Sequence, residues 1–191
     1  MGKFSSVQAT VPRGWHVKAM LPFALPIIVT FALLILVGDR WPRAIAPGSG
    51  LKLVGFGVAV VTSYIVWYFT VRGVNEPSVR RFIAIVCCVT GLMGWPVWST
   101  GVLPSINGSV LAQVNSARMT VERTEKNHKS KSRDFYHWAW LKAENGHCSS
   151  LSGRYFITEN LYLKLNNNEP PNVDVSFAPG LLGANVVVSI D

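Results

Sequence analysis

Three long, uncharged apolar stretches restrict what this chain can fold into. They cover residues 19–38, 53–71 and 82–103, and none contains Asp, Glu, Lys, Arg or His. A helix crosses the hydrocarbon core of a bilayer with about 20 apolar residues. Three such stretches leave no polar face for water, which argues against three core helices of a soluble protein. The sequence therefore predicts a membrane α-helical region with three transmembrane helices over residues 19–104.

The first stretch has some features of a signal peptide, because residues 1–18 form a polar lead with three basic side chains. Its apolar run is longer than the 7–15 residues of a signal-peptide core. A proline, Pro47, would also directly follow the small-residue motif that could be cleaved. We therefore expect this stretch to be a retained anchor.

Basic residues predict the orientation. The net charge is +8, and most of it lies in residues 1–116, where only Asp39 and Glu76 are acidic. If the N-terminus is cytoplasmic, the cytoplasmic segments hold Lys3, Arg13, Lys18, Arg72, Arg80 and Arg81, against five basic residues on the other side, Arg40, Arg43, Lys52, Arg118 and Arg123. Cytoplasmic segments carry the excess of Lys and Arg. We expect an integral protein of the bacterial inner (cytoplasmic) membrane, with a cytoplasmic N-terminus and a periplasmic C-terminal domain.

The last third of the chain has the pattern of a small β-rich soluble domain. Residues 105–116 have apolar side chains at helical spacing, which predicts a connecting amphipathic helix. Residues 117–191 alternate polar and apolar side chains, which predicts about five strands in a barrel-like or sandwich-like fold. The predicted strands are residues 117–126, 135–143, 153–158, 172–177 and 185–191. A short helix, capped by Thr158, is expected over residues 159–168.

Two adjacent cysteines, Cys87 and Cys88, lie inside the third apolar stretch. Neighbouring helical residues point about 100° apart, which is poor geometry for a mutual disulfide. A thiolate would need a positive neighbour or a metal, and the three stretches offer no charge or histidine. Small residues spaced four apart let helices approach closely. We therefore predict helix packing for Gly55, Ala59, Ser63, Cys87 and Gly91.

Catalytic and metal-binding patterns are weak. The C-terminal domain contains His128, His137, His147 and Cys148, which lack the compact spacing of a zinc site. Proton relays and haem sites in membranes need buried ionisable groups, which the apolar stretches do not contain. We expect no catalytic residues, no metal and no cofactor.

Two segments of the C-terminal domain are candidate contact surfaces. Residues 126–133 concentrate basic side chains and form either a solvated turn or a contact for acidic groups. Residues 177–183 form an apolar turn that either closes the core or docks on a membrane or partner. The candidate interaction residues are Lys126, Lys129, Lys131, Arg133, Phe177, Leu181 and Leu182. The near-neutral domain argues against nucleic acid.

These patterns favour a non-enzymatic membrane protein, an accessory or anchoring subunit whose β-domain binds an envelope partner. The expected partners are the lipid bilayer and another protein. One alternative is an immunity protein that captures a toxin at the membrane, and another is a membrane enzyme whose site has no recognisable motif.

Overall fold

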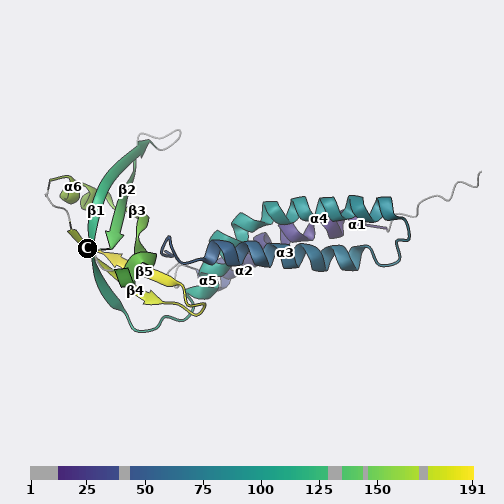
Figure 1. The fold of residues 1–191 in the computed structure, drawn as a ribbon, viewed down its shortest axis with the longest axis horizontal. Coiled ribbons are helices and arrows are strands. Elements are labelled where there is room, and N and C mark those ends of the chain that lie inside the picture. The colour runs from purple at the N-terminus through teal and green to yellow at the C-terminus, as the bar shows by residue number, and fades with distance from the viewer. Residues whose placement is uncertain (1–12, 39–43, 129–134, 144–145, 168–171) are drawn as a thin grey trace, which may run out of the picture. The chain divides into compact units, whose positions relative to one another are not determined.

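The computed structural model describes residues 13–38, 44–128, 135–143, 146–167 and 172–191. These residues form two compact units. One unit is built from helices and the other from a β-sheet with one packed helix (Figure 1).

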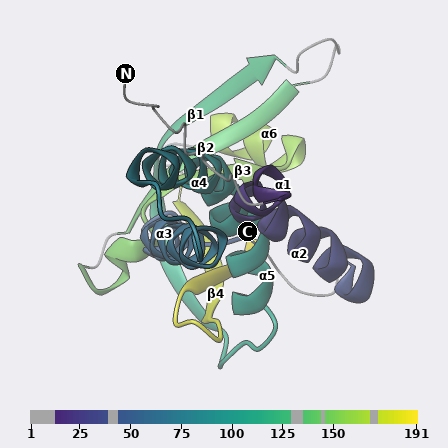
Figure 2. The same cartoon turned by 90° about the vertical axis from the view of Figure 1, so that its right-hand side faces the viewer.

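The helical unit contains a short first helix and three longer ones. They are α1 (Trp15–Ala19), α2 (Leu21–Val37), α3 (Leu51–Thr70) and α4 (Pro77–Val97). In the view along the helices, α3 and α4 lie together with α1 and α2 beside them (Figure 2). Each long helix is rich in apolar residues, and α2 contains two prolines, Pro22 and Pro26.

The first apolar stretch does not form one continuous helix, because the chain breaks at Met20 between α1 and α2. Pro22 lies in the first turn of α2, where a missing N–H costs little. A continuous helix would instead press the proline ring against the carbonyl of residue 18. The break leaves α2 with 17 residues.

The third stretch continues past its predicted end. After α4 the chain makes one π-helical turn, η1 (Trp98–Val102), and then enters α5 (Leu103–Asn107). Pro96 near the end of α4 removes one backbone donor, and the Thr100 hydroxyl donates to the Pro96 carbonyl at 2.8 Å. A π turn is a common adjustment where the regular hydrogen-bond ladder is interrupted. The whole helix, Pro77–Asn107, is 31 residues long.

The helices of this unit touch where side chains are small. Gly94 of α4 lies against the Pro22 carbonyl of α2, so closely that a Cβ there would be 2.5 Å from the oxygen. The buried Thr90 hydroxyl donates to the Ala19 carbonyl at 2.8 Å. On the other side of α4, the Trp95 indole donates to the Lys52 carbonyl of α3 at 2.9 Å. Helix α4 therefore contacts both the α1–α2 segment and α3.

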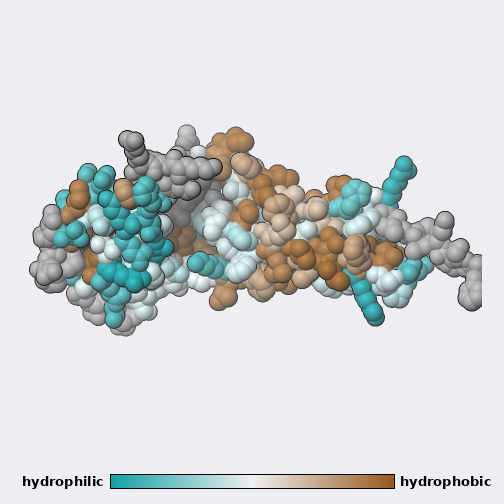
Figure 3. Space-filling model, turned by 90° about the horizontal axis from the view of Figure 1, so that it is seen from above, coloured by the Kyte–Doolittle hydropathy of each residue, from teal (hydrophilic) through white to brown (hydrophobic). Residues whose placement is uncertain are grey.

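Two helices are long and apolar enough to cross a membrane, Leu51–Thr70 and Pro77–Asn107, whereas α2 is shorter. Only 22% and 33% of their apolar windows are buried within the protein. The core helix of a soluble protein would be mostly covered, so most of this apolar surface faces outward. Figure 3 shows the surface of the helical unit as largely hydrophobic, with hydrophilic side chains gathered toward one end.

The described residues of the β unit form one antiparallel sheet of five strands. They are β1 (Asn115–His128), β2 (Phe135–Ala143), β3 (Gly153–Ile157), β4 (Asn172–Pro179) and β5 (Asn185–Ile190). The order across the sheet is β3-β2-β1-β4-β5. The sheet curls into a half-barrel (Figure 1), so the strands form one sheet and not a two-sheet sandwich. A five-stranded sheet in this Greek-key order is the plan of partly open barrels such as the OB-fold.

The curl depends on the long strand β1, which pairs with β4 over residues 115–120 and with β2 over residues 119–128. Its register with β2 shifts between Val121 and Arg123. A bulge of this kind bends a strand and increases its twist. One strand therefore belongs to both halves of the curled sheet.

The inner face of the half-barrel carries the core. Alternate residues of the strands are buried there, including Met119, Val121, Ala139, Leu141, Tyr155, Ile157, Val173 and Val175. Helix α6 (Glu159–Asn167) packs on this face through Leu165. The Thr158 hydroxyl accepts a hydrogen bond from the Leu161 amide at 3.3 Å, as predicted for a helix cap. The Tyr155 hydroxyl donates to the Leu151 carbonyl, and burial raises the pKa of Tyr155 above its ordinary value.

The segment before α3 joins the β unit instead of forming a free loop. The Ala46 amide donates to the Asn185 carbonyl at 2.9 Å, and the Val187 amide donates to the Ala44 carbonyl at 2.7 Å. Residues 44–46 therefore add a short antiparallel strand to the edge of β5. The Gly48 amide also donates to the Ser150 carbonyl at 3.0 Å.

The segment between α5 and β1 differs from the predicted amphipathic helix over residues 105–116. The helix ends at Asn107, and a turn follows in which the Gly108 amide donates to the Pro104 carbonyl at 2.9 Å. Leu111 then forms an isolated antiparallel bridge with Gly180. The apolar residues of this segment have helical spacing, but Gly108 and the pairing with β4 end the helix early.

Candidate functional site

The outer face of the sheet carries an unusual set of aromatic and charged side chains. Tyr136, Trp138 and Trp140 alternate with the buried residues of β2, so they share the outer face. The register places Trp140 between Arg123 of β1 and Arg154 of β3. We call the set Arg123, Glu125, Tyr136, Trp138, Trp140, Arg154 and Phe156 the aromatic–arginine face.

Glu125 is the polar centre of the aromatic–arginine face. Its carboxylate lies 3.2 Å from the Arg123 guanidinium and 3.1 Å from the Arg154 guanidinium. It also accepts a hydrogen bond from the Trp140 indole at 2.9 Å. The Glu125 carboxylate of β1 thus contacts side chains of β1, β2 and β3, the three strands that form this face.

The rings of the aromatic–arginine face stack with the guanidinium groups. Arg123 lies 4.6 Å from the ring centroid of Trp140, and Arg154 lies 4.2 Å from that of Trp138. Trp138 also meets Phe156 edge to face, with centroids 5.5 Å apart. Phe156 is 58% exposed. The face is therefore held rigid by cation–π and ionic contacts while it presents an apolar ring to its surroundings.

The apolar turn between β4 and β5 is held by one buried side chain. Asn107 is fully buried, and its amide group donates to the Ala184 carbonyl at 2.9 Å. Its side-chain oxygen accepts from the Leu182 amide at 2.9 Å, and its backbone carbonyl accepts from the Leu181 amide at 2.9 Å. Leu181 and Leu182 nevertheless remain 57% and 46% exposed. The turn displays these two side chains and does not bury them in the core.

The other candidate interaction residues are placed as follows. The Lys126 ammonium lies 4.0 Å from the ring centroid of Phe135, and Phe177 is partly buried against the sheet core. Lys129, Lys131 and Arg133 lie outside the described residues. The structure therefore places Leu181 and Leu182 in one turn. Lys126 lies near the C-terminal end of β1, whereas the N-terminal end of β1 pairs with Phe177 of β4.

A groove lies between β3 and β5, the two edge strands of the sheet. Its volume is about 450 Å³, and Arg154 is the charged residue among its described lining residues. Because neighbouring strands alternate in direction, β3 and β5 run the same way. A strand antiparallel to β3 and β5 could therefore pair with the edge of either one. Residues 44–46 already pair with β5 in this antiparallel way.

The residues considered for metal binding do not converge. His137 is buried against Tyr162, with ring centroids 4.7 Å apart, and His128 stacks on Phe135 at 4.5 Å. The side chains of His147 and Cys148 lie outside the described part of the chain. Among described residues, no group of three His, Cys, Asp or Glu side chains could hold a metal ion.

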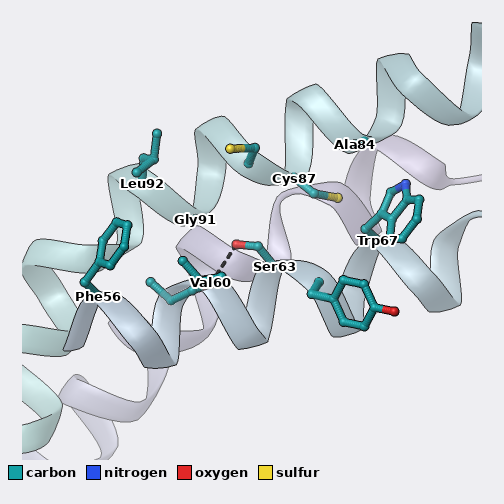
Figure 4. Close-up of a pocket in the computed structure, with 11 residues that line it drawn as sticks. Phe56, Val60, Ser63, Trp67, Ala84, Cys87, Gly91 and Leu92 are labelled. Atoms are coloured by element: carbon teal, nitrogen blue, oxygen red, sulfur yellow. Dashed lines mark hydrogen bonds between the residues drawn. The ribbon is translucent and has the colours of Figure 1, made fainter. Parts of the chain in front are cut away.

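The two cysteines of α4 have different surroundings: Cys87 is buried and Cys88 is exposed. Both line an apolar groove of about 290 Å³ between α3 and α4, together with Ala59, Ser63 and Gly91 (Figure 4). Gly91 lies directly against the Ser63 side chain, whose hydroxyl donates to the Ala59 carbonyl at 2.8 Å.

Four of the five residues predicted for helix packing therefore share one helix contact. The fifth, Gly55, faces Ser99 of η1, the turn that follows α4.

Comparisons with known proteins give no relatives: no family model, curated protein or solved structure matches this chain.

The alternation of residues 135–143 in the sequence places Tyr136, Trp138 and Trp140 on one face, but it does not reveal the groups that contact them. Glu125 and Arg154 are 29 positions apart, and Asn107 is more than 70 positions from the turn that it holds. Asn107 was visible in the sequence only as part of an Asn-Gly-Ser triplet, the pattern of a glycosylation acceptor. Its burial and its hydrogen bonds indicate a structural role instead.

Proposed function

We propose that this chain is a non-enzymatic integral membrane protein, an accessory or anchoring subunit whose β-domain binds a protein partner in the cell envelope. The single observation that carries the proposal is the aromatic–arginine face. Tryptophan, tyrosine and arginine are the residues most enriched at the energetic centres of protein interfaces. Here they are combined on one rigid sheet face with an exposed Phe156.

The plan of the sheet gives support by analogy. In partly open barrels of the OB type, ligands bind on the face of the second and third strands and at the loops after the first and fourth strands. In this chain the same face carries Trp138, Trp140 and Arg154. Fold analogy does not identify the ligand. The aromatic and arginine side chains of this face are of the types enriched at protein interfaces, which supports a protein partner.

The pairing of residues 44–46 with β5 supports a specific membrane topology. Both segments lie on the same side of the membrane, so the chain between them crosses it an even number of times. Helices α3 and α4 lie between them and are the two helices with sufficient length. We propose that both cross the bilayer.

Helix α2 is proposed as a third crossing. Its 17 residues span about 26 Å at 1.5 Å per residue, close to the roughly 30 Å of a hydrocarbon core. Its close contact with α4 at Gly94 supports a shared bundle. With three crossings, the N-terminus lies opposite the β-domain, and the excess of Lys and Arg favours a cytoplasmic N-terminus and a periplasmic β-domain in a bacterial inner membrane.

The test compares two exposed positions of the β-domain. Phe156→Glu places a charge on the aromatic–arginine face, whereas Leu163→Glu changes a similarly exposed residue of α6. Full-length variants are cross-linked in intact membranes, solubilised in mild detergent and purified. We expect Phe156→Glu to lose a cross-linked partner that the wild type and Leu163→Glu both retain. An identical set of partners for all three folded proteins would refute the role of this face.

A further inference from the structure

A second exposed apolar surface lies close to the end of the long helix Pro77–Asn107. Val110, Leu181 and Leu182 are 58%, 57% and 46% exposed. The bridge between Leu111 and Gly180 is antiparallel, so the next pair of positions along this register is Val110 and Leu181. Two segments about 70 residues apart therefore present one apolar rim.

The apolar rim is fixed to the helix end and is uncharged. Asn107, the last helical residue, bonds to Leu181, Leu182 and Ala184. The Ala112 amide also donates to the Pro179 carbonyl at 2.9 Å. Residues 104–117 and 175–190 contain no Asp, Glu, Lys or Arg. A contiguous exposed apolar patch is more informative than a single exposed leucine, because such patches mark contact sites for membranes or partners.

The helix fixes the depth of the rim in a bilayer. The third apolar stretch, residues 82–103, ends at Leu103, and Asn107 follows four residues later, about 6 Å farther along the axis of α5. The interfacial layer on each side of the hydrocarbon core is about 5–7 Å thick. If Pro77–Asn107 crosses the bilayer as proposed, this short chain distance brings Asn107 and the turn that it holds to the layer of lipid head groups.

We infer that Val110, Leu181 and Leu182 insert into the interfacial layer of the bilayer and fix the β-domain to the membrane surface. The inference rests on the proposed membrane crossing of Pro77–Asn107. We assign lipid as the contact of the apolar rim because the rim follows the apolar stretch of this helix in the chain. Only residues 104–109 separate Leu103 from Val110. Apolar side chains at this depth bury their surface without the need for a protein partner.

The experiment measures contact with lipid at single labelled positions. In full-length protein with Cys87→Ala, Cys88→Ala and Cys148→Ser, one position at a time is changed to cysteine and labelled with an environment-sensitive fluorophore. The labelled proteins are reconstituted into vesicles of phosphatidylcholine and phosphatidylglycerol that contain spin-labelled lipids. The test variants are Leu181→Cys and, independently, Leu182→Cys.

Two controls separate the possible outcomes. Met93→Cys reports the membrane crossing of α4, and Leu163→Cys reports an exposed site of α6; both positions are more than half exposed in the protein. We expect blue-shifted emission and about threefold stronger lipid quenching at positions 181 and 182 than at 163, because only the rim is expected at head-group depth.

Quenching at position 93 without quenching at 181 and 182 would overturn this inference and leave the membrane proposal intact. No quenching at position 93 would overturn the membrane crossing itself. A blue shift at 181 and 182 that spin-labelled lipids do not quench would mean that protein covers the turn, and it would also overturn the inference.

Discussion

Removing the side chain of Asn107 should destabilise the β-domain more than a typical substitution does. Asn107→Ala removes one of the two donors to the Ala184 carbonyl, which keeps its hydrogen bond from the Gly180 amide at 2.9 Å, and leaves the Leu182 amide without its acceptor. A buried polar group without a partner costs about 1–3 kcal/mol. The amide of Leu182 is only partly buried, so its loss is smaller. Together with the lost bond to the Ala184 carbonyl, we expect a total loss of about 1–3 kcal/mol in the free energy of unfolding.

The assay is thermal unfolding of the full-length protein in mild detergent, combined with hydrogen exchange of residues 179–186. For a domain of this size, 1 kcal/mol shifts the melting temperature by about 4–8 °C. Asn107→Ala should therefore lower the melting temperature of the β-domain by roughly 5–15 °C. It should also accelerate exchange in the turn. A shift of less than about 2 °C would refute the assigned role of this side chain.

Asn107→Asp provides a matched test with a distinct pH signature. The new carboxylate keeps the acceptor for the Leu182 amide but faces the Ala184 carbonyl with a charge and no proton. Burial and the carbonyl should raise the pKa of this carboxyl in the folded state. Its stabilising form is therefore the protonated one, and stability should increase as the pH falls through the folded-state pKa. Asn107→Ala should show no such recovery, and equal pH profiles for the two variants would contradict the hydrogen-bond geometry.

Three further sets of substitutions test other parts of the structure. Gly94→Ala should lower the melting temperature of the helical unit more than Gly91→Ala does, because its new methyl meets a backbone carbonyl instead of a movable serine side chain; equal losses would contradict the packing. Cys87→Ala and Cys88→Ala should each cost less than about 1.5 kcal/mol and leave metal content, measured by mass spectrometry, unchanged. Burial raises the pKa of Tyr155, and only the neutral phenol is tolerated in the core. The stability advantage of the wild type over Tyr155→Phe, measured by urea unfolding, should therefore be constant below the usual tyrosine pKa of 10.0 and shrink as the pH rises above it; an advantage that grows with pH would contradict this.

Local patterns in the sequence were sufficient to place the strands of the β-domain. Alternation predicted a strand over residues 135–143, and β2 has these bounds. The other four strands differ from their predicted ranges by only a few residues at the ends. These predictions succeeded because side chains on a half-buried sheet alternate between core and surface.

The curl of the sheet and the ends of the helices depend on contacts between distant segments. The bulge in β1 and its pairing with two strands decide that the sheet is a half-barrel, and alternation within one strand does not reveal them. The helix predicted after residue 104 ends at Asn107 because the following residues pair with the chain near Gly180. The linker at residues 44–46 pairs with β5 for the same kind of reason.

The aromatic–arginine face was only partly predictable. Alternation placed Tyr136, Trp138 and Trp140 on one face, but the order of strands determined that Arg123 and Arg154 flank the tryptophans. The sequence of residues 177–183 is compatible with an apolar turn that either closes the core or lies at the surface. The hydrogen bonds of Asn107 decide that Leu181 and Leu182 face outward.

The central claim is that this chain is an integral membrane protein that carries a β-domain, and alkaline carbonate extraction tests it most directly. Membranes containing the full-length protein are washed with carbonate and then with high salt, and the pellet and supernatant are compared. If helices Leu51–Thr70 and Pro77–Asn107 cross the bilayer as proposed, they bury apolar surface that neither treatment displaces from lipid. We expect all of the full-length protein to remain in the membrane pellet. Its release into the supernatant would contradict the claim.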